Sequence, residues 1–392
     1  MKESVVKLRS GRNGILRPNH PWIYKGQLLK PEGPIKGGSI VSVWTSDNKF
    51  AGRGYYNPTS EITVRLLTFK DEPLDDAFID QKIKEAVAKR TALKQKTNAY
   101  RAVFSEADGL PGLIIDLYAD TAVFQILTLG IERFIEAIVA AIRKNTDARY
   151  VYEKSDGPFR KREGLKIVKS WHGDKGNRYI EISEGKARFV VDIYEGHKTG
   201  FYLDQRSSRL AMHTVSKGKS VLDLFSYIGG FSIHAALSLA ANVTAVDIKE
   251  DWLEAGRKNA ILNNVADRIE FVKADAFEYL KRISASGKRF DVMIVDPPSF
   301  LKTRHSLASA SRGYKELNYM AIKCLNEDGV LATFSCSHNM PNEAFSDILK
   351  EAAARAGRAF TILKRCHQAE DHPIVRSIPE TEYLKGYFLK VA

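Results

Sequence analysis

One stretch in the C-terminal half of the chain decides its fold. It reads Ser220-Val221-Leu222-Asp223-Leu224-Phe225-Ser226-Tyr227-Ile228-Gly229-Gly230-Phe231. An apolar strand leads into a loop whose glycines, Gly229 and Gly230, let the backbone approach a bound molecule closely. The loop lacks the G-x-G-x-x-G spacing of a dinucleotide-binding loop. Asp223 stands near the place where a pyrophosphate would sit, and a carboxylate there suits a cationic ligand better than a phosphate.

From about residue 191 onward the sequence repeats the order strand, loop, helix. Strands are expected at residues 220–224, 242–246, 269–272, 290–295, 330–335, 360–363 and 387–390. Helices are expected between them at residues 231–239, 251–263, 276–283, 312–325 and 343–356. Several of the strands are almost continuously apolar, which is typical of parallel strands covered by helices on both faces. The pattern predicts an α/β fold with a doubly wound, Rossmann-like sheet over residues 191–392.

Acidic residues follow successive strands, at the edge where such sheets bind their ligands. Asp247 ends the second strand, where it could accept hydrogen bonds from both hydroxyls of a ribose. Asp275 follows the third strand and could meet an adenine amine, with Ala276 lining the ring. One such acid alone is more often a loop residue or a helix cap. Three of them beside a glycine loop predict an S-adenosylmethionine site, with Asp223 at the amino-acid end of the cofactor.

The fourth strand is followed by a stiff acidic loop. It reads Asp296-Pro297-Pro298-Ser299-Phe300. The two prolines remove two N–H donors and restrict the backbone, so that Asp296 is held rigidly. A rigid carboxylate can bind the N3 and N4 edge of a base that has been extruded from its stack. Two prolines can also simply end a strand, but the position beside the cofactor loop favours a functional role for Asp296.

The fifth strand ends at a cysteine, in the stretch Thr333-Phe334-Ser335-Cys336-Ser337-His338. C5 of cytosine is a poor nucleophile toward a methyl sulfonium. A thiolate that adds at C6 makes C5 enamine-like and able to attack the methyl group, and Asp296 could activate the ring at N3 for that addition. A lone cysteine is more often a small buried hydrophobe, which is our interpretation of Cys324 and Cys366. The position of Cys336 favours the nucleophile.

The composition narrows the classes of partner. The chain has 392 residues, of which 44% are hydrophobic, enough for two or three globular domains. Its net charge of +13 fits a protein that meets nucleic acid, or simply a basic protein. The three cysteines lack metal or disulfide spacing, no apolar run is long enough to cross a bilayer, and the N-terminus lacks a secretory signal. We expect a cytoplasmic protein with no metal and no membrane partner.

The first 190 residues have a different character. Residues 1–70 read as β-rich, with apolar runs at 40–44 and 62–67, and their basic residues are interleaved with aromatic ones. This mixture suits RNA, because cations hold phosphates and flat rings stack on bases. Residues 71–190 mix helices (75–96, 131–143) with strands (113–116, 121–127), and 154–178 reads as a basic loop, either solvated or an RNA clamp. We expect three domains: 1–70, an α+β domain at 71–190, and 191–392.

At this point the motifs resemble those of the RlmI-type ribosomal large-subunit RNA cytosine-5 methyltransferases, over essentially the whole chain. Further segments are similar to the PUA domain of that family: Lys7-Leu8-Arg9, His20-Pro21-Trp22-Ile23-Tyr24 and Gly52-Arg53-Gly54-Tyr55-Tyr56-Asn57. A similarity to the central domain of that family lies in Glu106-Ala107-Asp108-Gly109-Leu110-Pro111-Gly112-Leu113. The segment that helps to enclose the cofactor is resembled by Lys198-Thr199-Gly200-Phe201-Tyr202-Leu203-Asp204-Gln205-Arg206.

The resemblance implies a PUA-like RNA-binding domain at 1–70, S-adenosylmethionine as cofactor, and large-subunit ribosomal RNA as partner. It also implies which residues contact the cofactor or its surroundings: Gln205, Phe225, Ser226, Asp247, Asp275 and Asp296, with Cys336 as nucleophile. Many RNA cytosine-5 methyltransferases carry a second cysteine directly after the Asp-Pro-Pro segment, where this chain has Ser299. RlmI-type proteins are similar to this chain in having only the later cysteine. The sequence leaves the oligomeric state open, with a homodimer as one candidate.

Two other functions fit parts of the pattern. A methyltransferase acting on an exocyclic nitrogen, such as guanine N2, would grip the amine with Asp296 and leave Cys336 a structural role. A non-catalytic RNA-binding assembly factor would use the cofactor fold only as a scaffold, although the intact acids and glycine loop argue against it. Candidate RNA contacts near the site are Lys302, Arg304 and His305.

Overall fold

The computed structural model describes residues 4–14, 16–300 and 307–392. The chain forms two compact units, each with a hydrophobic core of its own. Unit 1 comprises Met1–Ile182, Val191–Leu203 and Asp371–Thr381, and unit 2 comprises Ser183–Val190, Asp204–Glu370 and Glu382–Ala392. A short two-stranded sheet pairs β11 (Tyr179–Glu184) with β12 (Ala187–Asp192). The three domains expected at 1–70, 71–190 and 191–392 stay a prediction.

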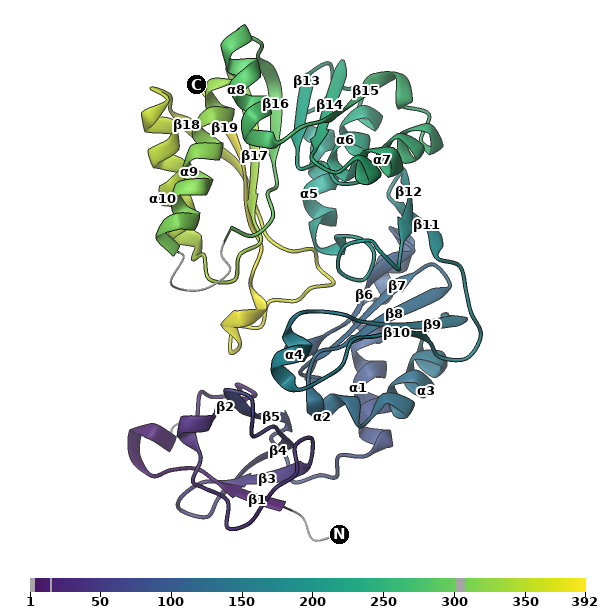
Figure 1. Cartoon of the computed structure of the whole chain (residues 1–392), viewed down its shortest axis with the longest axis vertical. Coiled ribbons are helices and arrows are strands. Elements are labelled where there is room, and N and C mark those ends of the chain that lie inside the picture. Colours follow the sequence, from purple (N-terminus) through teal and green to yellow (C-terminus); the bar gives the residue numbers. More distant parts are fainter. Residues whose placement is uncertain (1–3, 15, 301–306) are drawn as a thin grey trace. The chain divides into compact units, whose positions relative to one another are not determined.

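A five-stranded sheet forms the N-terminal part of unit 1, as the β-rich sequence predicts (Figure 1). In sheet order its strands are β1 (Ser4–Lys7), β3 (Ile40–Trp44), β4 (Phe50–Tyr56), β5 (Ile62–Thr68) and β2 (Trp22–Tyr24). β1 runs parallel to β3, and the other neighbours are antiparallel. Val6, Ile23, Val41 and Val64 are almost completely buried and contribute to its core. Burial of these side chains is the main stabilising contribution in so small a sheet.

The rest of unit 1 is a second five-stranded sheet with helices. In sheet order its strands are β10 (Val168–Trp171), β9 (Tyr150–Ser155), β8 (Thr121–Ile126), β7 (Leu113–Tyr118) and β6 (Ala99–Phe104). The helices are α1 (Asp76–Ala88), α2 (Leu129–Glu132), α3 (Ile135–Asn145) and α4 (Phe159–Glu163). α1 begins where the Asp75 carboxylate accepts a hydrogen bond from the Phe78 N–H, and it packs against α3 and β6.

Three expectations for this part need correction. The helix expected at 75–96 ends at Ala88 and is followed by a short 3-10 helix, Thr91–Gln95. The helix expected at 131–143 is two helices, α2 and α3. The stretch 154–178 is not simply a loop, because it contains α4 and β10.

Arg160 explains why this stretch is ordered. Its side chain is 1% exposed, so it is neither solvated nor free to clamp RNA. The guanidinium donates to the carbonyls of Ile126 and Lys166 and to the Glu132 carboxylate. A planar fork of N–H donors can serve several acceptors in fixed directions. Arg160 therefore ties α4 to β8 and α2.

Unit 2 contains the doubly wound sheet that the sequence predicts. In sheet order its seven strands are β15 (Ile269–Lys273), β14 (Asn242–Asp247), β13 (Ser220–Leu224), β16 (Phe290–Val295), β17 (Leu325–Ser335), β19 (Lys385–Val391) and β18 (Phe360–Cys366). The strands β13 to β17 run parallel to one another, and β19 runs antiparallel to both β17 and β18. The chain winds outward from β13 through β14 and β15, then crosses to β16. That reversal marks the ligand-binding edge in sheets of this kind.

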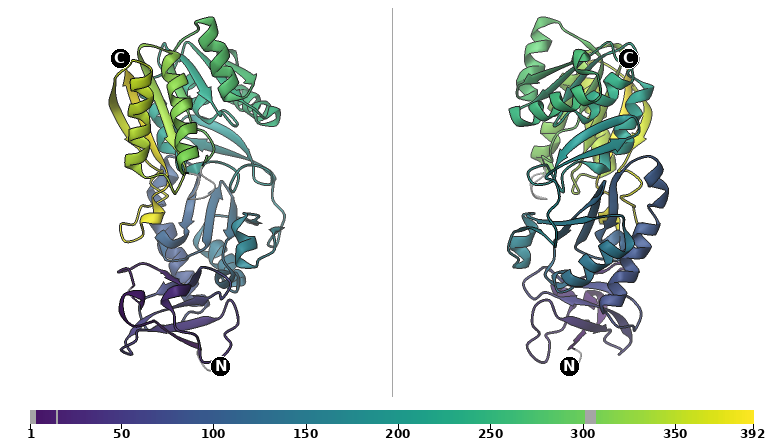
Figure 2. Two further views of the ribbon diagram at one scale, coloured as in Figure 1. Left: turned by 60° about the vertical axis from the view of Figure 1, so that its left-hand side comes forward. Right: turned by 90° about the vertical axis from the view of Figure 1, so that its right-hand side faces the viewer.

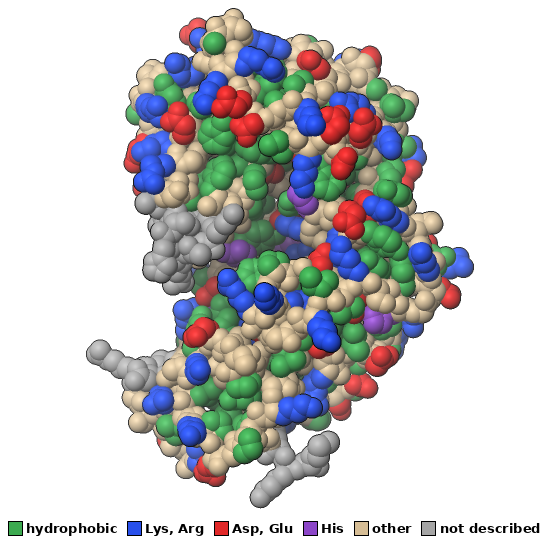
Figure 3. Space-filling model, in the orientation of Figure 1, with side chains coloured by type: hydrophobic (Ala, Val, Ile, Leu, Met, Phe, Trp, Pro, Cys, Tyr) green, Lys and Arg blue, Asp and Glu red, His purple; other side chains and the backbone are tan. Residues whose placement is uncertain are grey.

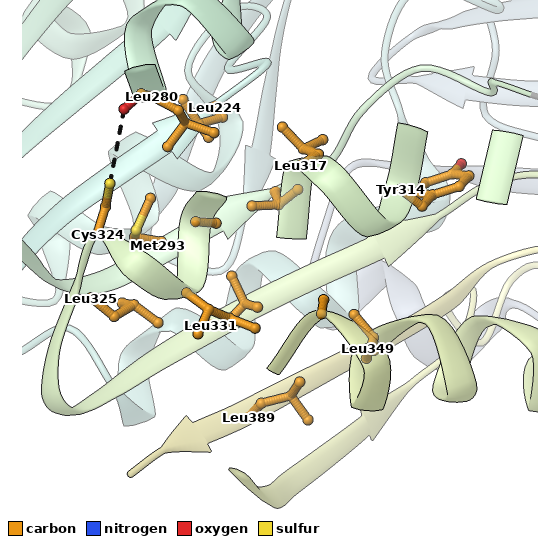
Figure 4. Close-up of a cluster of buried hydrophobic side chains, with 14 of the residues drawn as sticks. Leu224, Leu280, Met293, Tyr314, Leu317, Cys324, Leu325, Leu331, Leu349 and Leu389 are labelled. Carbon is orange, nitrogen blue, oxygen red and sulfur yellow. Dashed lines mark hydrogen bonds between the residues drawn. The ribbon is translucent and has the colours of Figure 1, made fainter. Parts of the chain in front are cut away.

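Helices cover both faces of this sheet (Figure 2). They are α6 (Gly230–Leu237), α7 (Glu250–Leu262), α8 (Ala276–Ser286), α9 (Leu307–Lys323) and α10 (Asn342–Arg355), with the short α5 (Arg206–Leu210) preceding β13. α6 and α7 pack together on one face, and α9 packs between α8 and α10 on the other. The second face holds the main core, where Leu224, Met293, Leu331 and Leu389 are fully buried (Figure 4). Every strand and helix expected after residue 219 is present; the strands at 220–224 and 290–295 have the expected ends, and the other elements have shifted ends. Within the described residues, no helix is both long and apolar enough to span a membrane.

Candidate active site

The loop after β13 has a constrained backbone. Phe225 and Tyr227 have positive φ angles of 63° and 51°, and Gly229, with φ 81°, is the N-cap of α6. The Ser226 N–H donates to the Val246 carbonyl at 3.0 Å, which fixes the loop to β14. Left-handed backbone costs about 1–3 kcal/mol for residues with a Cβ, and such strain gathers at functional sites. The sequence predicted a glycine loop at this position, but it did not indicate which residues have a left-handed backbone.

Asp223 lies beneath this loop and is 1% exposed. Its Oδ2 accepts hydrogen bonds from the N–H and the hydroxyl of Ser232, at 3.1 and 2.6 Å. Its Oδ1 is buried and has no hydrogen-bond partner among the described residues. Burial raises the pKa of Asp223 to about 7, helped by the nearby carboxylates of Asp296 and Asp247. A cation placed at Oδ1 would satisfy the oxygen and offset the cluster of negative charge, which fits the amino-acid end of S-adenosylmethionine.

Asp247 shapes the glycine loop from the end of β14. Its Oδ2 accepts from the Tyr227 N–H at 2.9 Å, and its Oδ1 accepts from the Lys249 N–H at 3.0 Å. Each carboxylate oxygen can accept a second hydrogen bond, so both contacts are compatible with a ribose diol at the same carboxylate. The predicted ribose contact of Asp247 stays a prediction.

Asp275 is the N-cap of α8. Its Oδ1 accepts from the N–H groups of Phe277 and Glu278, at 2.9 and 3.1 Å. Capping alone is a sufficient reason for an aspartate at this position. The cap uses only Oδ1 and the side chain is exposed, so Oδ2 remains available to a ligand. Ala276, which follows it, packs in the core of unit 2.

Asp296 and Gln205 are brought together by the fold although they are far apart in the sequence. The Gln205 Nε2 donates to the Asp296 Oδ1 at 3.1 Å. Gln205 is 3% exposed, and its Oε1 has no partner in the described part of the chain. The same holds for the buried hydroxyl of Ser226. Two orphaned buried polar atoms near the glycine loop are expected where a polar ligand completes a site.

Cys336 follows the end of β17 and is half-buried. The hydroxyls around it form a connected set: Ser335 donates to the Tyr314 hydroxyl at 3.0 Å, and Tyr314 and Ser337 lie 3.2 Å apart. The Ser299 and Ser337 hydroxyls are 2.7 Å apart. Ser299 belongs to the Asp-Pro-Pro loop, so this pair joins the loop of Asp296 to the loop of Cys336. Sequence reasoning singled out neither Tyr314 nor Ser337.

Lys385 is another residue that sequence reasoning missed. It begins β19, pairs with Ser335 of β17, and is 5% exposed. Its Nζ donates to the carbonyls of Ser337 and Tyr383, at 2.9 and 3.0 Å. The signal in the sequence was a lysine at the head of the apolar run Gly386-Tyr387-Phe388-Leu389. A buried lysine is uncommon enough to indicate a specific role.

The other two cysteines lie in ordinary packing positions. Cys324 is 1% exposed, and its Sγ lies 3.9 Å from the Leu280 carbonyl in the core (Figure 4). Burial raises the pKa of Cys324 and also that of Cys366, which is half-buried at the end of β18. A raised thiol pKa makes a poor nucleophile. The candidate RNA contacts Lys302, Arg304 and His305 lie outside the described residues.

Three features define a Rossmann-like S-adenosylmethionine-dependent methyltransferase: the sheet whose direction of winding reverses, the glycine loop, and the acids at successive strand ends. A family model for S-adenosylmethionine-dependent methyltransferases matches residues 160–385, and a model for a PUA-like domain matches residues 6–69. A solved methyltransferase, SMU.776 in complex with SAH, has the same fold at a TM-score of 0.85 and 23% identity over all of both chains. S-adenosylmethionine is the cofactor.

Two curated relatives are similar over nearly their full length. Ribosomal RNA large subunit methyltransferase I of Alteromonas mediterranea is 41% identical, with 98% of each chain covered. The protein of the same name from Klebsiella pneumoniae is 38% identical, with 98% of this chain and 97% of the relative covered. This chain belongs to the ribosomal RNA large subunit methyltransferase I family.

Proposed function

We propose that this protein forms 5-methylcytosine in large-subunit ribosomal RNA through a covalent adduct with Cys336. The observation that carries the proposal is the hydroxyl pair Ser299–Ser337, which joins the loop of Asp296 to the loop of Cys336 at the ligand edge of the sheet. A nucleophile and a base-binding carboxylate on adjoining rigid loops are what addition to a pyrimidine ring requires. The names of the relatives supply the ribosomal substrate.

In this mechanism the chain's residues prepare the base for methylation. Asp296 holds the N3 and N4 edge of an extruded cytosine. The Cys336 thiolate then forms a bond to C6, and the π electrons of the C5–C6 double bond move to make C5 enamine-like. Bound S-adenosylmethionine would supply the methyl group as an electrophilic carbon, to which C5 would form a bond while the sulfonium sulfur keeps the electrons of the bond that breaks. C5 then gives up its proton to a base, the C5–C6 double bond reforms, and the Cys336 sulfur leaves with the electrons of its bond to C6.

The cofactor site would consist of residues around the glycine loop that have either a buried polar atom or a strained backbone. We assign Asp223 to the amino-acid end, Asp247 to the ribose, and Asp275 with Ala276 to the adenine. The remaining contacts are assigned to Gln205, Phe225, Ser226, Gly229, Gly230 and Asp296. The support is the unpartnered Oδ1 of Asp223 together with the unpartnered polar atoms of Gln205 and Ser226 among the described residues.

RNA would be the partner, held partly by the PUA-like domain at residues 6–69. On the face drawn in Figure 3, Lys and Arg side chains are spread over the surface and interspersed with Asp and Glu. The net charge of +13 would therefore act through scattered phosphate contacts, not through one basic patch on that face. An enzyme with this substrate would work in the cytoplasm.

A covalent trap tests the cytosine-5 chemistry. The protein is incubated with S-adenosylmethionine and large-subunit RNA containing 5-fluorocytidine, and protein–RNA adducts are sought on a denaturing gel. A base can remove a proton from C5 but cannot remove a fluorine there, so the methylated adduct stays bonded to the enzyme. We expect an adduct that disappears in Cys336→Ala and persists in Cys366→Ala, a matched cysteine removal outside the site.

The alternatives predict different results in the same assay. If no adduct forms while ordinary RNA is methylated and Cys336→Ala stays active, the protein is an exocyclic-nitrogen methyltransferase and Cys336 is structural. If the protein binds RNA but neither binds S-adenosylmethionine nor methylates RNA, it is instead a non-catalytic RNA-binding assembly factor.

A further inference from the structure

Lys385 interacts with both residues that flank Cys336 in the sequence. Its backbone pairs with Ser335, the residue before the cysteine, in the β17–β19 ladder. Its Nζ lies 2.9 Å from the carbonyl oxygen of Ser337, the residue after the cysteine. The side chain is thus fixed at both ends against the short segment that carries the thiol. It is also 5% exposed, so water screens its charge little.

We propose that Lys385 is a positioning residue for Cys336, whose ammonium charge stabilises the thiolate and whose hydrogen bond to Ser337 holds the cysteine segment in place. The role rests on the proposed nucleophilic function of Cys336. The thiol proton leaves to solvent before the base binds, and Lys385 keeps its own protons. The thiolate then carries the electron pair that forms the bond to C6.

The hydrogen-bond inventory of Lys385 supports this role. An ammonium group has three donors. Two of them go to the carbonyls of Ser337 and Tyr383, and the third has no partner among the described residues. The bond to Ser337 holds this third donor near the residue that follows Cys336, where it is available to a thiolate.

Electrostatics point the same way. Burial lowers the pKa of Lys385, while the neighbouring Glu382 and Cys336 raise it. Interaction between two groups is mutual, so a cation whose charged form is favoured by Cys336 must in turn favour the Cys336 thiolate. A nearby Lys or Arg is a common cause of a lowered cysteine pKa.

Other charged and titratable groups around Cys336 must be weighed against Lys385. Asp296 from the loop after β16 opposes a thiolate, because like charges repel. Tyr314 from α9 is neutral, since burial raises its pKa. His338 stacks on Tyr383 with ring centroids 5.1 Å apart, and it would add to the effect only when protonated. Among these groups, Lys385 is the cation that is present at neutral pH.

The test measures the thiol itself, without RNA or methyl transfer. The rate of iodoacetamide alkylation of Cys336 is followed by peptide mass spectrometry from pH 5 to pH 10. In the wild type we expect a thiol pKa below the ordinary value. In Lys385→Met the pKa should rise by about one unit, which slows alkylation about tenfold at pH 7 and leaves the high-pH limiting rate unchanged.

Two variants make the result specific. Lys390→Met removes a lysine from the same strand, whose Nζ pairs with Asp328 at 3.2 Å, and it should leave the profile unchanged. If Lys385→Met fails to fold, Lys385→Gln keeps N–H donors without the charge and gives the same comparison. An unchanged thiol pKa in a folded Lys385 variant would overturn the proposal.

The outcome is separable from that of the covalent trap. If the trap fails but the alkylation profile shifts, the coupling of Lys385 to Cys336 stands and the cytosine-5 chemistry falls. If the trap succeeds and the profile does not shift, Cys336 is the nucleophile and Lys385 has only a structural role.

Discussion

The hydroxyl oxygens of Ser299 and Ser337 lie 2.7 Å apart, although they come from loops that follow different strands of the sheet. Ser337 is buried and also bonds to Tyr314, whereas Ser299 follows the two prolines of the acidic loop. The pair fixes the distance between the loop of Asp296 and the loop of Cys336. In the proposed mechanism these loops carry the base-binding carboxylate and the nucleophile, and fixed geometry between such groups is worth several orders of magnitude in rate.

Removal of either hydroxyl should therefore slow catalysis more than it weakens cofactor binding. We expect Ser299→Ala and Ser337→Ala each to lower kcat about tenfold, because the two loops lose their link. The Kd for S-adenosylmethionine should stay within about twofold of the wild type. The double variant should be no slower than the worse single variant, since both remove one interaction. Additive losses would show that the two serines act independently.

Asp223 should make cofactor binding depend on pH. The pKa of the buried carboxyl is about 7, against an ordinary 3.8, so the free protein holds a proton that a bound cation would expel. Affinity for S-adenosylmethionine should rise with pH up to about 7 and level off above it, changing about tenfold per unit below. Calorimetry in two buffers of different ionisation enthalpy should detect the released proton. Asp223→Asn should remove the pH dependence and most of the affinity.

The same carboxyl should affect the stability of the protein without cofactor. Between pH 4 and 7 the folded state binds more protons at Asp223 than the unfolded state does. The free energy of unfolding should therefore fall as the pH rises through this window, the reverse of the usual aspartate behaviour. Urea unfolding at several pH values should show this contribution in the wild type and lose it in Asp223→Asn.

Two substitutions of Asp275 distinguish its role as the N-cap of α8 from its proposed contact with the cofactor. Asp275→Ala should lower the free energy of unfolding by about 1 kcal/mol, because α8 loses its N-cap. Asp275→Asn keeps the cap, since the amide oxygen can accept the same two N–H bonds. If the carboxylate meets the cofactor, Asn should weaken S-adenosylmethionine binding while preserving stability. Equal affinities for Asn and wild type would leave Asp275 a cap only.

Arg160 should matter for stability and not for RNA. Arg160→Ala leaves the acceptors on Ile126 and Lys166 without their buried donor, so we expect a loss of about 2–4 kcal/mol. Lys161→Ala, at the exposed neighbouring position, is the matched control and should change stability by less than about 0.5 kcal/mol. Thermal melts measure both. Weaker RNA binding by Arg160→Ala with unchanged stability would restore the clamp interpretation.

RNA affinity should fall steeply with salt. Phosphate contacts release counterions, so the logarithm of the binding constant should decline linearly with that of the salt concentration. Fluorescence anisotropy with a fragment of large-subunit RNA, between about 50 and 200 mM KCl, measures the slope. A flat response would mean that the excess of Lys and Arg does not meet the RNA backbone.

The sequence predicted what depends on local pattern. Continuous apolar runs located the strands of unit 2, and the acids after them located Asp223, Asp247 and Asp275 at one edge of the sheet. Helix ends were less accurate, because caps and 3-10 turns depend on individual hydrogen bonds. The helix expected at 75–96 illustrates this, since it ends at Ala88.

Contacts between distant segments could not be predicted in this way. Nothing in the local pattern near Cys336 indicates that Lys385 or Tyr314 lies beside it, because those neighbours depend on the order of strands in the sheet. The same applies to Gln205 and Asp296, which only the resemblance had placed together. The stretch 154–178 was misinterpreted for a related reason: a basic sequence does not show that one of its residues, here Arg160, is buried.

The place of β19 in the sheet has a consequence for how the protein is made. β19 follows β18 in the chain but lies between β17 and β18. A nascent chain that has released β18 therefore has no neighbour in this sheet for that strand until β19 has also emerged from the ribosome. Lys385 arrives with β19, so the surroundings of the Cys336 thiol are completed only after Asp223, Asp247, Asp275 and Asp296 have been translated. The Cys336 thiol would therefore lack its lysine neighbour until this strand of the sheet has been made.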